Sequence, residues 1–399
     1  MIEQLVNTIQ PYAWGSRQAL AELRGDSKPA TGPEAELWMG AHPLAPSQLL
    51  GSAQTLQAAI DAAPEALLGA EVLSQYGQKL PFLLKVLAAA TPLSLQAHPS
   101  ATQAVQGYAA DEAAGIRLDA PNRNYKDQNH KPELLCAISE FWALCGFRAV
   151  AQSLELLQEL DVPELAELRR TLAAEPNSVG ISRAFSALNQ ADRETRRTLA
   201  EQTTRACQAR SSQSQRFADE LGWAARVGEL YPGDVGVVSA LLLNLVRLAP
   251  GQAVYLPAGN LHAYLGGTGV EIMASSDNVL RGGLTPKHVN VPELLRILDF
   301  QPLQVEVLTP VPHGIEQVYA TPVREFRLSY FDLADDSCSV KISGPEIWLV
   351  TSGAFELRST TSAPLELERG RSAFVSADTG QLSLRGKGRI FRASVAYPL

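Results

Sequence analysis

The sequence predicts a mainly β protein with one α-helical insertion, because the pattern of apolar and turn residues changes twice along the chain, from strand-like to helix-like and back. Residues 1–148 mix short apolar runs with turn residues, as in TGPEAELWMGAHPLAP, which is typical of strands joined by tight turns. Between residues 149 and 221, leucines recur at helical spacing and only one glycine and two prolines occur. From Tyr231 the strand-like pattern of short apolar runs and turn residues returns, in segments such as PEIWLVTSGAFELRS.

Helices are expected at three places in this β background. Two short helical pieces are predicted near residues 53–76 and 101–115. Within the insertion, Asp161-Val162-Pro163-Glu164 predicts a helix start, because proline is tolerated in the first helical turn. The predicted units are a central catalytic domain of residues 1–148 and 229–312, a helical insertion of residues 149–228, and a C-terminal β domain of residues 313–399.

Composition narrows the class of protein. The chain has 399 residues, a formal net charge of −8 and no basic stripe, which argues against nucleic-acid binding. No apolar stretch approaches the roughly 18 residues of a membrane span, and the N-terminus lacks the pattern of a signal peptide. The four cysteines are scattered without a CxxC pair, as expected of reduced thiols. We therefore expect a cytoplasmic protein, and a monomer.

The segment PLSLQAHPS, residues 92–100, contains two side chains that can bind a metal. In a strand, residues two apart face the same side, so Gln96 and His98 point together into one interior, with Ser94 on the same face. Taken alone, the pair is more simply the polar edge of a core strand. Its significance depends on what other segments bring to the same place.

Two later segments offer partners. NYKDQNHKPELLCAI places Glu133 ahead of an apolar strand, where a carboxylate is either a ligand or a solvated turn residue. GQAVYLPAGNLH has the spacing G-x5-P-x-G-x2-H of the second metal motif of cupin barrels, which turns His262 inward. The cupin pattern is not literal, since Gly266 stands where asparagine is usual and Gln96-Ala97-His98 replaces H-x-H.

The candidate metal ligands are Gln96, His98, Glu133 and His262. Two nitrogens, two oxygens and no thiolate suit Zn²⁺ with a position left open for water or substrate. Mn, Fe, Co and Ni tolerate the same ligands, so the donor types alone do not fix the metal. An open position favours a catalytic site over a closed structural one.

A charged, glycine-rich segment follows, VEIMASSDNVLRGGLTPKHVN. The preceding GGTG, residues 266–269, lacks both G-x-G-x-x-G and a P-loop lysine, which argues against a nucleotide loop. Among the remaining histidines, His42 and His313 have no evident partner, and His130 is expected to support the site without binding metal. The C-terminal unit has no histidine after His313, so we expect no metal there.

Five separated blocks, taken together, resemble the type I phosphomannose isomerase family, also called mannose-6-phosphate isomerases. The resemblance covers nearly the whole chain in order. It implies a cupin-like (jelly-roll) central domain, a helical insertion and a second cupin-like C-terminal domain. One departure is Asn290, where aspartate is usual. The blocks are PYAWGS (11–16), AELWMGAHP (35–43), PFLLKVLAAATPLSLQAHPS (81–100), NYKDQNHKPELL (124–135) and LPAGNLHAYLGGTGVEIMASSDNVLRGGLTPKH (256–288).

The resemblance also assigns roles. It implies one Zn²⁺ per subunit, held by Gln96, His98, Glu133 and His262, and it places the family's catalytic arginine at Arg281. Without the resemblance, Lys85 would be interpreted as a strand residue whose aliphatic stem is buried while its charged end reaches solvent. The positions associated with the sugar phosphate or the cavity wall are Lys85, Ser94, Lys131, Glu271, Lys287 and Trp14.

The implied reaction interconverts mannose 6-phosphate and fructose 6-phosphate through a cis-enediolate. It needs a base near C1 and C2 and positive charge for the developing oxyanion. Glu271 is the hypothesis for the base, because it lies on the His262 side of the barrel, while metal-bound hydroxide and a histidine stay as alternatives. Competing functions are a metal-dependent cupin oxygenase, disfavoured by the glutamine ligand and the lysines, and a non-catalytic sugar-binding protein.

Overall fold

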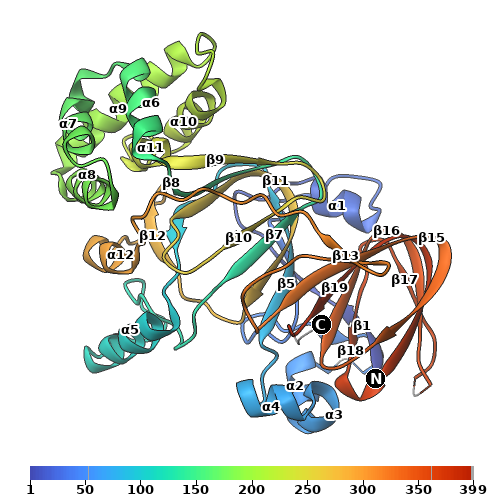
Figure 1. Ribbon diagram of the computed structural model, residues 1–399. Coiled ribbons are helices and arrows are strands. Elements are labelled where there is room, and N and C mark those ends of the chain that lie inside the picture. Colours follow the sequence, from blue (N-terminus) through green and yellow to red (C-terminus); the bar gives the residue numbers. More distant parts are fainter. Residues whose placement is uncertain (53, 361, 397–399) are drawn as a thin grey trace.

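The structure is a computed structural model that describes residues 1–52, 54–360 and 362–396. Two large antiparallel sheets form its framework, and helices lie around them (Figure 1). Strands hold 32% of the residues and helices 31%, so the chain is rich in sheet and carries almost as much helix. No helix in the described part of the chain is long and apolar enough to cross a membrane.

The first sheet has ten strands and is built around one long strand, β11. Its main path runs β10-β7-β11-β5-β3-β2, while β6 and β8 pair with another stretch of β11. The strands are β2 (Thr8–Gln10), β3 (Glu36–Met39), β5 (Phe82–Ala89), β6 (Leu95–Ala97), β7 (Glu133–Ala137), β8 (Phe141–Phe147), β9 (Leu243–Leu248), β10 (Ala253–Leu256), β11 (His262–Ala274) and β12 (Leu280–Gly283).

The second sheet has nine strands and combines the two ends of the chain. Its path is β13-β14-β15-β19-β16-β18-β1-β4, and β17 pairs with β16. The N-terminal strand β1 thus lies in the sheet formed mainly by the C-terminal segment. The strands are β1 (Ile2–Val6), β4 (Gln48–Leu49), β13 (Val311–His313), β14 (Glu316–Val318), β15 (Arg327–Lys341), β16 (Glu346–Arg358), β17 (Leu365–Glu368), β18 (Ser372–Val375) and β19 (Gln381–Ser394).

Helices occur near residues 53–76 and 101–115, where the sequence predicts them, and throughout the insertion. The helix after His98 begins at a capping box, in which Ser100 and Gln103 satisfy each other's backbone amides. The helices are α1 (Ala19–Arg24), α2 (Leu56–Ala62), α3 (Pro64–Leu68), α4 (Ala70–Tyr76), α5 (Ala101–Ala113), α6 (Val150–Leu160), α7 (Ala166–Ala174), α8 (Ser178–Gln190), α9 (Arg193–Arg210), α10 (Ala218–Leu230), α11 (Gly236–Leu241) and α12 (Val291–Ile297), with 3-10 turns η1 (Pro163–Leu165) and η2 (Ala377–Thr379).

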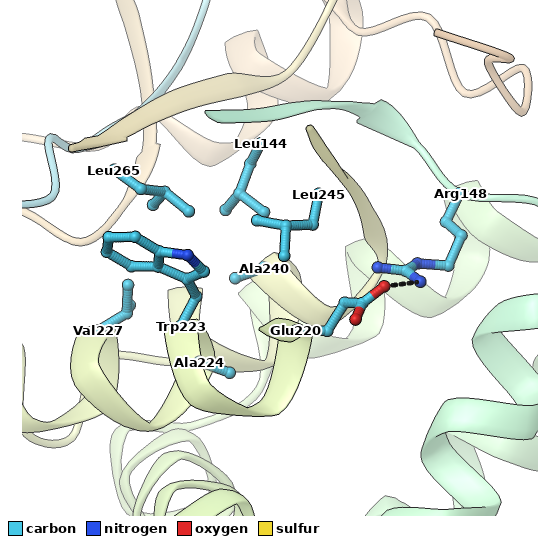
Figure 2. A pocket seen from close by; sticks show the side chains of 9 residues that line it. All are labelled: Leu144, Arg148, Glu220, Trp223, Ala224, Val227, Ala240, Leu245 and Leu265. Carbon is cyan, nitrogen blue, oxygen red and sulfur yellow. Dashed lines mark hydrogen bonds and ion pairs between the residues drawn. The ribbon is translucent and has the colours of Figure 1, made fainter. Parts of the chain in front are cut away.

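The insertion docks on the first sheet through α10. Figure 2 shows the Trp223 indole against Leu144 and Leu265, which come from β8 and β11. Beside this apolar contact, Arg148 Nη1 donates to Glu220 Oε1 at 3.0 Å. Trp223 is partly buried here, and side chains of the insertion and of the first sheet belong to one continuous apolar cluster.

A second apolar core joins the two sheets. It contains Leu37 and Val86 of the first sheet together with Phe374 and Phe391 of the second, all at most 4% exposed. Because these side chains pack in one cluster, the second sheet supports the back of the strands that carry the candidate site.

Candidate active site

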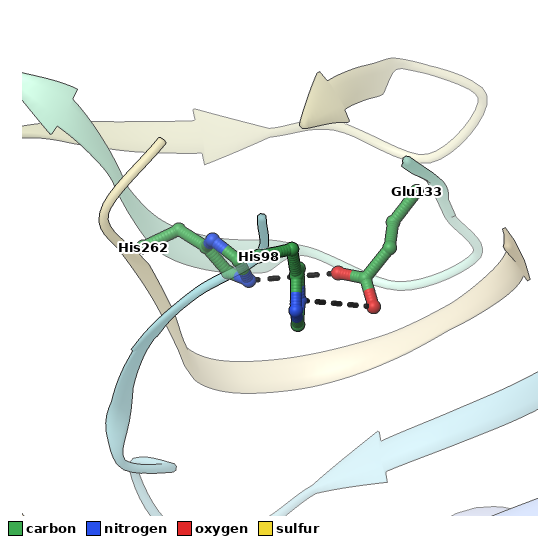
Figure 3. A group of neighbouring side chains, drawn as sticks. All are labelled: His98, Glu133 and His262. Atoms are coloured by element: carbon green, nitrogen blue, oxygen red, sulfur yellow. Dashed lines mark ion pairs between the residues drawn. The ribbon is translucent and has the colours of Figure 1, made fainter. Parts of the chain in front are cut away.

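Three buried side chains from distant parts of the chain meet inside the first sheet. His98 follows β6, Glu133 begins β7 and His262 begins β11, and Figure 3 shows both rings facing the carboxylate. His98 Nε2 lies 3.3 Å from Glu133 Oε1, and His262 Nε2 lies 3.5 Å from Glu133 Oε2. One donor atom from each residue lies within 4.8 Å of the others, which is the size of a metal site.

Gln96 lies at the edge of this cluster, as its sequence spacing predicts. It is the cross-strand partner of His262, and its amide nitrogen lies 3.3 Å from His262 Nε2. Because a carboxamide exchanges its oxygen and nitrogen by a 180° rotation, the same side chain can present an oxygen to a cation. All four predicted ligands therefore come together.

The protonation of the two imidazoles fits a metal. His98 Nδ1 faces the backbone carbonyl of Asn278 at 2.7 Å, and His262 Nδ1 faces the carbonyl of Asn260 at 3.0 Å. A carbonyl only accepts, so each Nδ1 carries the proton and each Nε2 presents a lone pair. His98 Nε2 and Glu133 Oε2 are buried without a hydrogen-bond partner among the described residues.

Electrostatics keep these donors in the form that binds a metal. Burial lowers the pKa of His98 to about 4, although the Glu133 charge opposes the shift, so the ring is neutral at pH 7. Burial alone raises the pKa of Glu133, but neighbouring His98 and Lys131 hold it well below its usual value. With His98 neutral, Lys131, whose Nζ lies 3.2 Å from Glu133 Oε1, is the cation that keeps the carboxylate ionised.

A second group of buried charges lies beside the cluster. Lys85 Nζ is 3.4 Å from Glu271 Oε2 and 3.7 Å from Glu36 Oε2, and the Tyr264 hydroxyl donates to Glu271 Oε1 at 2.8 Å. Burial raises the pKa of Glu271 against the effect of Lys85, and Glu133 raises it further. Burial lowers the pKa of Lys85, but Glu36 and Glu271 outweigh it and the net shift is upward.

Arg281 and Lys287 form a cationic edge of the site. Arg281 is the cross-strand partner of Gln96, and its Nη1 donates to Ser94 Oγ at 2.9 Å. The positive charge of Arg281, together with burial, lowers the pKa of Lys287. Neither cation has a salt bridge to an acidic residue within the described part of the chain. Two cations and a hydroxyl therefore lie together at this edge of the site.

Trp14 and the other histidines have clear positions. Trp14 is partly buried and stacks on Tyr12 with ring centroids 5.8 Å apart. His130 Nε2 lies 2.7 Å from Glu325 Oε1, so it contacts the C-terminal segment instead of the metal cluster. His42, expected to lack a partner, is 4% exposed and its Nε2 lies 3.1 Å from Asp277 Oδ1.

Glu36 and Tyr264 belong to this group of buried charges but were not predicted from the sequence. Glu36 lies in AELWMG, where a glutamate inside an apolar strand was a signal, because a buried carboxylate needs a partner. Tyr264 follows His262 by two residues, so the alternation of β11 places both on one face.

These features define a metal-dependent enzyme that acts on an anionic substrate. They are a buried His–Glu–His cluster, buried carboxylates that contact lysines, and a cationic edge beside them.

Comparison with known proteins identifies the family. The profile for the phosphomannose isomerase type I catalytic domain matches residues 2–150. Mannose-6-phosphate isomerase of Salmonella typhimurium is 41% identical over 98% of this chain and 99% of its own, and the Homo sapiens protein is 32% identical over 93% and 92%. A crystal structure of mannose 6-phosphate isomerase bound with zinc and yttrium superposes with a TM-score of 0.91 at 38% identity, covering 99% of this chain and 100% of that one. The chain belongs to the mannose-6-phosphate isomerase family.

The cluster geometry predicts that Glu133→Gln abolishes stoichiometric metal binding. The substitution keeps the size but removes the charge that faces both imidazoles, so we expect zinc affinity to fall more than about 100-fold, beyond the usual effect of outer-shell changes. Metal content after dialysis, measured by atomic emission, reports the loss. His42→Ala is the control, since His42 is as buried but faces Asp277. A Glu133→Gln protein with one tightly held zinc would contradict the assignment.

Proposed function

We propose that this protein is a zinc-dependent aldose–ketose isomerase that interconverts D-mannose 6-phosphate and D-fructose 6-phosphate through a cis-enediolate. The observation that carries the proposal is the His98–Glu133–His262 cluster beside the Lys85–Glu271 pair. The full-length similarity to mannose-6-phosphate isomerases supplies the substrate class. The partner is thus a sugar phosphate.

One Zn²⁺ per chain is the proposed cofactor, held by Gln96, His98, Glu133 and His262. When bound, it supplies Lewis-acid stabilisation of negative charge on the substrate oxygens at C1 and C2. A related crystal structure is described as holo and zinc bound, at a TM-score of 0.90 and 38% identity. His98 Nε2 and Glu133 Oε2, which have no hydrogen-bond partner in the described part of the chain, are ligand atoms that suit such an ion.

Glu271 is the proposed general base. Burial raises the pKa of its carboxyl, which strengthens it as a base, while Lys85 and the Tyr264 hydroxyl stabilise the anion. The carboxylate takes the proton from C2 of the open-chain aldose and returns it at C1. Lys85 holds positive charge beside the carboxylate throughout, so the pair limits the change in net charge inside the buried site.

The proposed binding site for the anionic parts of the substrate consists of Arg281, Lys287 and Ser94. A phosphate dianion relieves the repulsion between the two cations, and the Ser94 hydroxyl donates to it. Arg281 also lies across from Gln96, so its guanidinium can stabilise the oxyanion of the enediolate. Lys131 keeps Glu133 ionised. Trp14, which packs against the apolar cluster that contains Tyr264, is the proposed wall of the cavity.

The proposed architecture is a pair of cupin-like domains with a helical insertion between segments of the first. Residues 1–148 and 229–312 make the central domain, 149–228 the insertion and 313–399 the C-terminal domain, although β1 and β4 pair in the sheet of the C-terminal domain. A repeated arrangement supports a common origin of the two sheets: an indole donates to the glutamate two residues before it, and a cation on the facing strand stacks on the ring. The residues are Glu36, Trp38 and Lys85 in one sheet and Glu346, Trp348 and Arg392 in the other.

The first test is a coupled assay of mannose 6-phosphate conversion. We expect turnover that stops after chelation and returns on addition of one equivalent of zinc, because the donor set is built for one cation. Protein with bound zinc and no turnover would defeat the proposal. Oxygen uptake with iron bound would point instead to a cupin oxygenase, and tight sugar-phosphate binding without turnover to a binding protein.

Glu271→Gln tests the base. We expect kcat to fall by about 10²- to 10⁴-fold, with equal loss of deuterium exchange from C2-labelled mannose 6-phosphate. In the wild type, kcat/KM should fall as pH drops through the raised pKa of Glu271, since the base is then protonated; the variant should lack this step. Glu346→Gln, a buried glutamate of the second sheet, is the control. Full exchange in Glu271→Gln would exclude Glu271 as the base.

Arg281→Ala tests the oxyanion role. Removing a charge that acts on the developing oxyanion should lower kcat by roughly 100- to 1,000-fold while zinc content stays at the wild-type value. Arg170→Ala, which removes an exposed arginine of the insertion, provides the comparison. Turnover within twofold of wild type in Arg281→Ala would contradict the assignment.

A further inference from the structure

Two loops without regular structure flank the metal cluster and contact each other. One, residues 124–132, leads into Lys131 and Glu133; the other, residues 275–279, connects the strand of Glu271 to the strand of Arg281. The two loops therefore adjoin the strands that carry Glu133, Glu271 and Arg281. A single buried side chain, Asn278, makes most of the connection.

The Asn278 carboxamide is fully buried and uses its whole hydrogen-bonding capacity on the other loop. Its Oδ1 accepts from the backbone amides of Lys126 and Asp127 at 2.7 and 3.2 Å. Its Nδ2 donates to the carbonyls of Asp127 and Asn129, both at 2.9 Å. The side chain thus supplies hydrogen-bond partners to four backbone groups of a loop that has no helix or strand to pair them.

Asp127 makes the reverse connection. Its Oδ2 accepts from the backbone amide of Asp277 at 2.8 Å, and its Oδ1 accepts from Ser276 Oγ and from the amide of Asn129, both at 2.9 Å. Ser276 Oγ in turn accepts from the amide of Asn278 at 3.2 Å. Each loop therefore holds the other, and neither is fixed by its own sequence neighbours alone.

The backbone carbonyl of Asn278 acts directly on a metal ligand. It lies 2.7 Å from His98 Nδ1 and fixes the proton on that nitrogen. For His262, the corresponding carbonyl belongs to Asn260, two residues earlier, so the local backbone sets the geometry. The carbonyl that orients His98 comes from a residue 180 positions away, so it must be held in place by tertiary contacts.

We propose that Asn278 is a positioning residue: its side chain clamps residues 126–129, and through this clamp its carbonyl orients His98 as the Nδ1–H tautomer with Nε2 toward the metal position. The same clamp places Lys131 against Glu133. The inference rests on the proposed metal site. It goes further by assigning the orientation of His98 to a residue outside the four proposed ligands, whose side chain bonds to the loop of residues 126–129.

The test compares Asn278→Ala with Asn189→Ala. Asn189 is also a buried asparagine, with a side-chain bond to the Phe185 carbonyl in the insertion, so it controls for the loss of a buried amide. We expect Asn278→Ala to weaken zinc binding about tenfold or more in a chelator competition, and Asn189→Ala to leave it unchanged. In metal-free wild type, nitrogen NMR of the histidine rings should show His98 as the Nδ1–H tautomer, and Asn278→Ala should lose that single state.

Equal zinc affinity and an unchanged His98 tautomer in Asn278→Ala would overturn the inference, as would equal loss of zinc affinity in Asn189→Ala. Should Asn278→Ala fail to fold, Ser276→Ala decides: it removes one hydroxyl of the same clamp, and we expect zinc affinity several-fold below wild type. An unchanged affinity there would reject the clamp. If wild type bound no zinc, the proposed function would fail, while the tautomer comparison would still decide the inference.

Discussion

The antiparallel register of β11 is the constraint on which the site depends. Its first residue, His262, lies opposite Gln96, and Glu271 further along lies opposite Lys85. Met273 pairs with Glu133 on another neighbour. The register of β11 shifts between Tyr264 and Gly266, and this shift lets His262 and Glu271, nine residues apart, face the same interior. A slip of one residue in either half of the strand would turn its side chain away from that interior. The metal cluster therefore depends on the pairing of β11 with β6 and β8, and the Lys85–Glu271 pair depends on its pairing with β5 and β7.

Charge balance explains why so many ionised groups can be buried in this sheet. Lys85 and Lys131 each contact a carboxylate, and Glu271 gains a further donor from Tyr264. In the second sheet, the analogous cation Arg392 bonds to Glu346 and Glu316 at once, so its donors are occupied. A buried ion pair contributes little net stability. Among the residues that the structure describes, Nε2 of His98 in the first sheet has no hydrogen-bond partner, so it is free to bind a metal.

The sequence predicted the convergence of the four proposed ligands, because strand alternation and the G-x5-P-x-G-x2-H turn are local features. It also predicted the helices near residues 53–76 and 101–115 and those of the insertion, but not α1, α11 or α12, and α11 lies where strands were expected. The pairing of β1 with β18 joins residues more than 360 positions apart and has no local signal. The contacts of Asn278 were equally hidden, because an asparagine in a polar segment is typical of an exposed turn, and only tertiary structure shows that it is buried.

The GGTG segment shows how a departure from a motif can have a structural cause. Gly267 has φ +119°, and a Cβ there would lie 2.4 Å from the Glu140 carbonyl oxygen. A Cβ on Gly266 would approach Trp223 of the insertion to 3.3 Å. At these glycines β11 passes from its pairing with β6 and β8 to its pairing with β5 and β7. The insertion therefore packs against β11 at the point where its strand partners change, between His262 and Glu271. The glycines at this point leave room for Trp223, and the change of partners lets one strand carry both His262 and Glu271.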